Sequence, residues 1–136
     1  MPMTPSPLIK KLGLRPGMSA LLLNPPSGYA ESLGELPEGV RFSSQPQGQY
    51  DFVQVFIKDS DEFIRLVPDA QAAIRYDKML WICYPKKTGN IPSDLSRDVV
   101  WKRMMGTGLR PVTQIAIDET WSALRFRPEE LVKSKS

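Results

Sequence analysis

The sequence contains no histidine and only one cysteine among its 136 residues. Without histidine, the commonest general base and the commonest metal ligand are missing, and every Ser/His or Cys/His dyad is excluded. A single cysteine also rules out disulfides within the chain and zinc sites built from several cysteines. Because Cys83 lies within the apolar run "MLWICY", a small buried residue is favoured over a reactive thiol.

Long apolar runs and a strong charge imbalance are also missing. Nowhere do about 18 apolar residues run together, and the first residues, "MPMTPSPLIKK", lack the continuous apolar segment of a secretion signal. The 18 basic and 15 acidic residues are mixed along the chain, with a net charge of +3. No helix-turn-helix, zinc-finger or ribonucleoprotein pattern is present. We expect a soluble cytoplasmic protein with no membrane segment and no dedicated nucleic-acid binding.

The length and composition predict one globular domain. With 41% hydrophobic and 24% charged residues, a chain of 136 residues can bury a core without disulfides or metal. We expect this domain to span residues 9–128, between mobile tails at 1–8 and 129–136. No internal repeat or linker divides it.

Alternating strand and helix patterns predict an α/β domain. The "DET" connection between the last two strands is so short that it demands an antiparallel hairpin. The order of elements predicts a three-layer domain with a mostly parallel sheet. Strands are expected at 18–24, 40–44, 50–57, 78–85, 109–117 and 121–127, a short helix within 30–39, and longer helices within 58–78 and from Ser93 or Asp94 to about Met105.

The helix expected within 58–78 has an apolar face and a proline inside it. Asp59 and Glu62 form the pattern of a capping box, and Pro68 predicts a kink or a division into two pieces. Trp81, in a strand, and Trp101, on the following helix, are interpreted as core residues. The apolar face consists of Phe63, Val67, Ala70 and Ile74, which are spaced as on one side of a helix.

Several phrases resemble the class I S-adenosylmethionine methyltransferases, over about Leu12 to Arg127. A "D-x-V-x-x-F"-like strand is matched by "YDFVQVF", a "G-G-x-L-W-I"-like strand is matched loosely by "YDKMLWI", and the chain closes with a hairpin. The resemblance implies a shortened, Rossmann-like fold. Its strand order would be 2-1-3-4-6-5, with the last strand inserted antiparallel.

A second set of phrases resembles the bacterial family known as domain of unknown function 3052. That family has no settled activity, so the resemblance implies a bacterial source and a fold but no chemistry. The phrases are "LGLRPGM", "LPEGV", "YDFVQVF", "LWICYPKK" and "DETWSALRF".

The first candidate site is the turn "NPPSGY", where a Rossmann-type domain holds its cofactor. It offers Asn24, Ser27, Gly28 and Tyr29 as candidate ligand residues, but it has one glycine and two prolines that carry no N–H group. The segment "RFSSQPQGQ" after the second strand has no acidic residue for ribose hydroxyls. We expect a rigid structural turn and no cofactor, with an atypical S-adenosylmethionine site as the alternative.

The second candidate is the basic loop "YPKKTGN", which follows the fourth strand. Ligands of open α/β sheets bind beyond the carboxyl ends of the strands. Lys86, Lys87 and a helix start near Ser93 suit a phosphate or carboxylate, although Asp94 would repel it. In the alternative, the lysines are solvated, and Ser93 and Asp94 are helix caps. Lys58, after the third strand, faces the same edge as a ligand or a cap.

The third candidate is the hairpin turn "IDETW". Asp118 and Glu119 suit a general base or a hydroxyl binder, or else a solvated turn that pairs with the lysines. Trp121 suits stacking on a ligand ring, or core packing. On the expected topology this turn lies on the same edge as Lys86, about two strand spacings or 10 Å away.

Three functions follow from these patterns. The first is a non-catalytic or vestigial methyltransferase-like domain that binds a small anionic ligand or a protein partner at the carboxyl edge of the sheet, with no cofactor or metal. The second is an S-adenosylmethionine-dependent methyltransferase with an atypical cofactor site, which rests on fold analogy alone. The third is a structural or assembly role through an apolar patch or a sheet edge.

Overall fold

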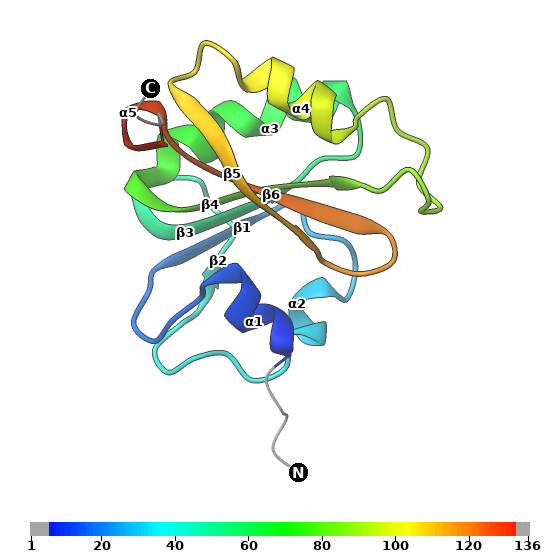
Figure 1. Ribbon diagram of the computed structural model, residues 1–136. Coiled ribbons are helices and arrows are strands. Elements are labelled where there is room, and N and C mark those ends of the chain that lie inside the picture. Colours follow the sequence, from blue (N-terminus) through cyan, green and yellow to red (C-terminus); the bar gives the residue numbers. More distant parts are fainter. Residues whose placement is uncertain (1–5, 133–136) are drawn as a thin grey trace.

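A computed structural model describes residues 6–132 of the chain as three layers (Figure 1). A six-stranded sheet forms the middle layer; helices α3 and α4 cover one face, and α1 and α2 cover the other. The helices are α1 (Pro7–Leu12), α2 (Tyr29–Ser32), α3 (Ser60–Ala73), α4 (Arg97–Met104) and α5 (Glu129–Val132). The strands are β1 (Ala20–Leu23), β2 (Phe42–Ser43), β3 (Tyr50–Phe56), β4 (Ile74–Pro85), β5 (Leu109–Ala116) and β6 (Trp121–Pro128).

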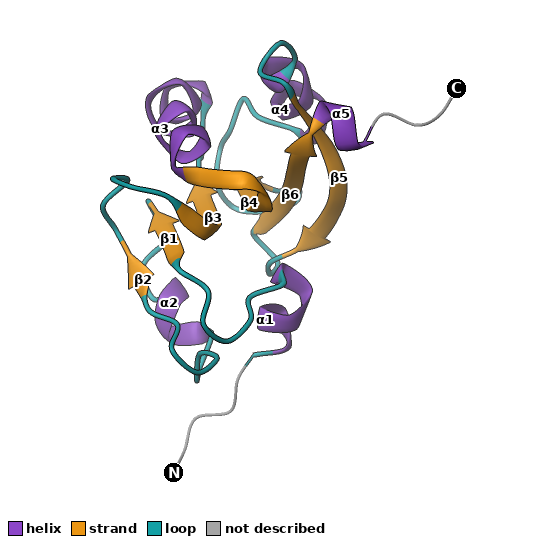
Figure 2. Ribbon diagram, turned by 90° about the vertical axis from the view of Figure 1, so that its left-hand side faces the viewer, coloured by secondary structure: helices purple, strands orange, loops and turns teal. Residues whose placement is uncertain are grey.

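The sheet has the order β2-β1-β3-β4-β6-β5, which confirms the predicted topology. Strands β2, β1, β3 and β4 pair in parallel, and β6 lies antiparallel between β4 and β5 (Figure 2). Pro85, the last residue of β4, pairs directly with Trp121, the first of β6. The turn before β6 is therefore closer to Lys86 than the two strand spacings expected: the Lys86 N–H donates to the carbonyl of Thr120 at 2.8 Å.

From Met79 to Pro85, strand β4 is buried on both faces, as its apolar run predicts. It starts at Ile74, four residues before the predicted start, with an irregular register against β3 near its beginning. Its side chains alternate between two hydrophobic clusters, so each face of the sheet has its own core. Leu80, Ile82 and Tyr84 pack on the α3–α4 side, and Met79, Trp81 and Cys83 pack on the α1–α2 side.

Helix α3 runs without interruption through Pro68, so the predicted division into two pieces is wrong. Proline removes one helical hydrogen bond, to the carbonyl four residues earlier. That carbonyl belongs to Ile64, and both Ile64 and Pro68 are exposed, so water can reach this part of the helix. Ile74 was predicted on the apolar face of the helix, but it begins β4 instead; the buried face consists of Phe63, Val67, Ala70 and Ala73, together with Glu62.

Helix α4 starts later than predicted. Ser96 is its N-cap and accepts a hydrogen bond from the Val99 N–H at 3.3 Å, so neither Ser93 nor Asp94 caps this helix. Only Val100 and Met104 are buried, which is the narrow stripe of a helix that touches the core along one line. Trp101 lies beside that stripe and is 44% exposed, so its assignment to the core is wrong.

The ordered structure extends beyond the expected domain at both ends. Of the expected tails, residues 1–5 and 133–136 lie outside the described residues. Within the described part, the Ser6 N–H donates to the Leu33 carbonyl at 2.9 Å, and Ser6 caps α1. Glu129–Val132 form α5. Among residues 6–132, no helix is both long and apolar enough to cross a membrane.

Three polar side chains meet inside the core on the α1–α2 side. The Gln54 amide, which has no exposed surface, donates to the Tyr29 hydroxyl at 2.8 Å and to the Cys83 sulfur at 3.4 Å. Burial raises the pKa of the Cys83 thiol to about 12. The buried-thiol interpretation of Cys83 is confirmed. Such a thiol is both inaccessible and protonated at neutral pH.

We expect Cys83 to stay unreactive toward a chromogenic disulfide reagent in the folded protein and to react fully once guanidinium unfolds it. The reason is that the thiolate forms only when the thiol reaches water. Absorbance at pH 8 measures the reaction. A Lys102→Cys variant, with an added thiol on the exposed side of α4, controls for the reagent. Rapid stoichiometric labelling of native wild-type protein would contradict the burial.

Candidate functional site

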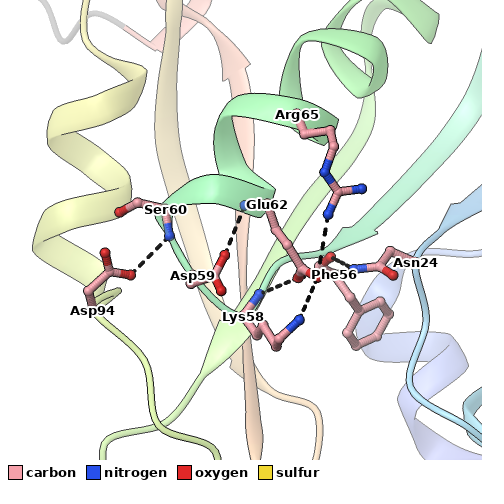
Figure 3. A network of polar contacts seen from close by, with 8 residues as sticks. All are labelled: Asn24, Phe56, Lys58, Asp59, Ser60, Glu62, Arg65 and Asp94. Atoms are coloured by element: carbon pink, nitrogen blue, oxygen red, sulfur yellow. Dashed lines mark hydrogen bonds and ion pairs between the residues drawn. The ribbon is translucent and has the colours of Figure 1, made fainter.

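The carboxyl edge of the sheet has two parts, and the first lies where β1 and β3 end (Figure 3). Asn24, directly after β1, adopts a left-handed backbone with φ 55. Its amide nitrogen donates to the Phe56 carbonyl at 2.9 Å and to the Glu62 carboxylate at 3.1 Å. The same carboxylate accepts from the Lys58 N–H and the Lys58 ammonium, both at 2.8 Å, and Arg65 lies 3.7 Å away. These contacts tie Asn24 and Lys58 to the Glu62 carboxylate.

Glu62 is charged although it is buried. Burial opposes ionisation of the carboxyl, but the hydrogen bonds and charge of Lys58, aided by Arg65, lower the pKa of Glu62 below its usual value. The hydrogen bond to Glu62 in turn raises the pKa of Lys58. Asp59 accepts from the Glu62 N–H at 2.9 Å, as a capping box requires. In a complete capping box the Glu62 carboxylate would accept from the Asp59 N–H; here it accepts from the Lys58 N–H instead.

The residues of the first turn do not fit an adenosyl cofactor. A cofactor turn needs free backbone N–H groups facing the ligand, and Pro25 and Pro26 have none. Gly28 is the left-handed N-cap of α2, and Tyr29 is buried against Gln54. No acidic residue follows β2 in segment 44–49. Ser27 is exposed and is the one candidate of this turn without a described structural contact.

The second part of the edge is a hollow beyond the end of β4. It has a volume of about 540 Å³, and both predicted lysines line it. Lys86 begins a turn in which the Gly89 N–H donates to the Lys86 carbonyl at 3.0 Å. A side chain at Gly89 would come within 3.1 Å of the Thr120 carbonyl, so glycine allows the loop to pack on the hairpin turn. The lining residues are Pro85, Lys86, Lys87, Gly89, Asn90, Ile91, Pro92, Ser93, Asp94, Leu95 and Ser96.

The far side of this loop is anchored to the start of α3. Asp94 accepts from the Ser60 N–H at 2.9 Å, so it caps the start of α3 rather than of α4, and this bond lowers the pKa of Asp94. Ser93 accepts from the Leu95 N–H at 3.0 Å, and Leu95 is buried. The hollow is therefore held by fixed contacts at both ends of the loop.

A second hollow of about 360 Å³ shares the two lysines with the first. Tyr84 and Ser122, opposite each other on β4 and β6, line it together with Arg97 at the start of α4. Arg97 donates to Gln114 at 3.5 Å across this hollow. The remaining lining residues are Pro85, Thr88, Ser96 and Asp98.

The hairpin turn of the third candidate lines neither hollow. Asp118 accepts from the N–H groups of Thr120 and Trp121, both at 2.8 Å, so its carboxylate shapes the turn. Trp121 is buried, and its ring packs edge-on against Phe56 with centroids 5.1 Å apart. Glu119 is exposed. The turn instead contacts the basic loop, because the Thr120 carbonyl accepts a hydrogen bond from the Lys86 N–H.

The structure thus brings Lys86, Lys87 and Ser93 into one hollow and separates them from Asn24 and Lys58, which belong to the Glu62 network. Tyr84, Arg97 and Ser122 were not predicted as site residues. A signal for Tyr84 was present, because a tyrosine inside an otherwise apolar central strand needs a partner for its hydroxyl. Among the described residues, no three potential metal ligands of the His, Cys, Asp and Glu types come together.

Comparison with known proteins supports the fold. No family model matches the chain, and no curated protein sequence matches it. A solved structure of a ribosomal protein L11 methylase from Lactobacillus delbrueckii subsp. bulgaricus is similar, with a TM-score of 0.53 and 10% sequence identity. The match covers 93% of this chain and 81% of that one. At this identity the likeness establishes a methyltransferase-like fold alone.

We expect Glu62→Gln to lower the free energy of unfolding by about 2 kcal/mol at pH 7, because a neutral amide pairs less well than the buried carboxylate with Asn24 and the Lys58 ammonium. The folded-state pKa of Glu62 is depressed, so its stabilisation is present at neutral pH and is lost as the pH falls through that pKa. The difference between variant and wild type should therefore shrink below about pH 4.

Denaturant unfolding between pH 3 and 8 checks this expectation, with Asp61→Asn as the matched control. Asp61 lies in the same helical turn but is exposed, so its loss should cost under about 1 kcal/mol. Equal effects of the two substitutions on the free energy of unfolding at every pH would contradict a specific stabilising role of the Glu62 network.

Proposed function

We propose that this protein is a non-catalytic domain of methyltransferase-like fold that binds a small anionic ligand in the hollow at Pro85–Ser96. The observation that carries the proposal is a hollow of about 540 Å³ lined by Lys86 and Lys87 directly beyond a central strand. Small-molecule sites commonly have volumes of about 300–1,000 Å³ and lie beyond the carboxyl ends of strands in such sheets.

The rigidity of the loop supports this proposal. The Lys86 N–H is bonded to Thr120, Gly89 packs on the same turn, and Asp94 is bonded to Ser60. A loop held in this way loses little conformational freedom when a ligand binds, so less of the interaction energy is spent on ordering. A loop that only connects two elements would not require hydrogen bonds to both the hairpin turn and α3.

The chemistry of the edge favours binding over catalysis. The sequence has no histidine, and two carboxylates near the loop have structural partners: Asp94 accepts from the Ser60 N–H at the start of α3, and Asp118 shapes the hairpin turn. In the first turn, where an S-adenosylmethionine site would be sought by fold analogy, Pro25 and Pro26 have no N–H groups, and no acidic residue follows β2 in segment 44–49. We also propose that the chain belongs to the domain of unknown function 3052 family and that it is located in the cytoplasm.

A thermal-shift panel on the wild type and on a Lys86→Ala/Lys87→Ala variant tests this function. The panel contains adenine and nicotinamide nucleotides, sugar phosphates, small carboxylates, S-adenosylmethionine and short RNA. A ligand at about 100 times its dissociation constant adds about 2.7 kcal/mol to the free energy of unfolding. We expect at least one small anionic ligand to raise the melting temperature of the wild type by several degrees and that of the variant by much less.

The matched control is Lys10→Ala/Lys11→Ala, which removes two exposed, adjacent lysines from α1 on the opposite side of the sheet. It should respond to the ligand as the wild type does. An unchanged shift in the Lys86→Ala/Lys87→Ala variant, or no shift with any small compound, would overturn the proposal and direct the search to protein partners.

A further inference from the structure

Resting on the proposed function, we infer that the second hollow is the subsite for the anionic group of the ligand, and that this group is a phosphate monoester. Tyr84, Ser122 and Gln114 lie on the floor of this hollow, on the strands, and Arg97 and Lys86 form its wall. The first hollow, around Asn90 and Ser93, then holds the uncharged body of the ligand.

Tyr84 is the first reason to place a ligand here. The residue is only 3% exposed, and its hydroxyl has no hydrogen-bond partner among the described residues. A buried polar group without a partner is rare and costly in proteins. The ring belongs to the apolar cluster between the sheet and helices α3 and α4, and Tyr84 is also one of the residues that line the second hollow.

The protonation state of Tyr84 suits a donor. Burial raises the pKa of Tyr84, so the phenol keeps its proton at neutral pH. A phenol that donates to an anionic oxygen makes a charge-assisted hydrogen bond, which is stronger than a bond between neutral groups.

The charge in the hollow is the second, independent reason. Lys86, Lys87 and Arg97 line it together with one carboxylate, that of Asp98, which leaves an excess of two positive charges. A phosphate monoester carries a charge of about −1.5 to −2 at pH 7, and a carboxylate carries −1. A tetrahedral phosphate also presents three oxygens, which suit donors arriving from the floor, the helix and the loop. The first turn of α4 adds backbone N–H groups that have no partner within the helix.

The experiment is a titration of isotope-labelled protein with inorganic phosphate, followed by amide chemical shifts at constant ionic strength, with acetate as the competing anion. We expect saturable shifts centred on Tyr84–Lys87 and Ser96–Asp98, and weaker binding of acetate. Tyr84→Phe removes only the hydroxyl, and Arg97→Gln removes an exposed charge. Each should weaken phosphate binding about tenfold or more. Lys102→Gln, an equal charge loss elsewhere on α4, should leave binding unchanged.

A stability measurement separates this role from a structural one. Since the Tyr84 hydroxyl has no partner to lose, phosphate-free Tyr84→Phe should melt no lower than the wild type. A clear fall in its melting temperature would show that the hydroxyl supports the fold, and would count against the subsite.

Other outcomes distinguish the two proposals. If the ligand panel still gives a lysine-dependent shift but phosphate does not act through Tyr84 and Arg97, or if acetate binds as tightly, the subsite is overturned and the proposed function stands. If neither hollow responds to phosphate or to any compound in the panel, both proposals fail.

Discussion

The buried carboxylate of Glu62 determines which part of the sheet edge remains open. It joins the end of β1 to the end of β3 by accepting from Asn24 and from the backbone and ammonium of Lys58. A charge can be buried in this way only because its partners offset the cost of removing it from water. The ends of β1 and β3 are therefore linked by the protein's own polar groups.

The antiparallel insertion of β6 has the opposite effect beside β4. It brings the hairpin turn against Lys86, whose N–H donates to the Thr120 carbonyl. Because Gly89 has no side chain, the loop can pack closely on this turn. The same insertion sets Ser122 opposite Tyr84 and so forms the floor of the second hollow. One edge of the sheet thus carries a salt-bridge network at β1 and β3 and two hollows at β4 and β6.

Periodicity and turn chemistry in the sequence were sufficient to predict the order of elements from β1 to β6 but missed α1 and α5. The strand order followed from a resemblance to methyltransferases. Three neighbouring residues, Ser93, Asp94 and Ser96, are all good caps by residue type, so the sequence could not assign them. In the structure Ser96 caps α4, and Asp94 accepts from Ser60 at the start of α3. The lysine loop could be proposed as a site from its place after a central strand. Tyr84 and Arg97 could not be paired from sequence, because their meeting depends on where α4 starts. Trp101 is exposed because it lies just outside the stripe of Val100 and Met104.

We propose that this fold binds its ligand at the end of β4 and not at the end of β1. A crystal structure of the protein soaked with S-adenosylmethionine and, separately, with a sugar phosphate tests it most directly. We expect electron density for the phosphate compound between Tyr84 and Ser96, and none for S-adenosylmethionine beside Asn24. Density for S-adenosylmethionine across Asn24–Tyr29, with the Glu62 network opened, would contradict it.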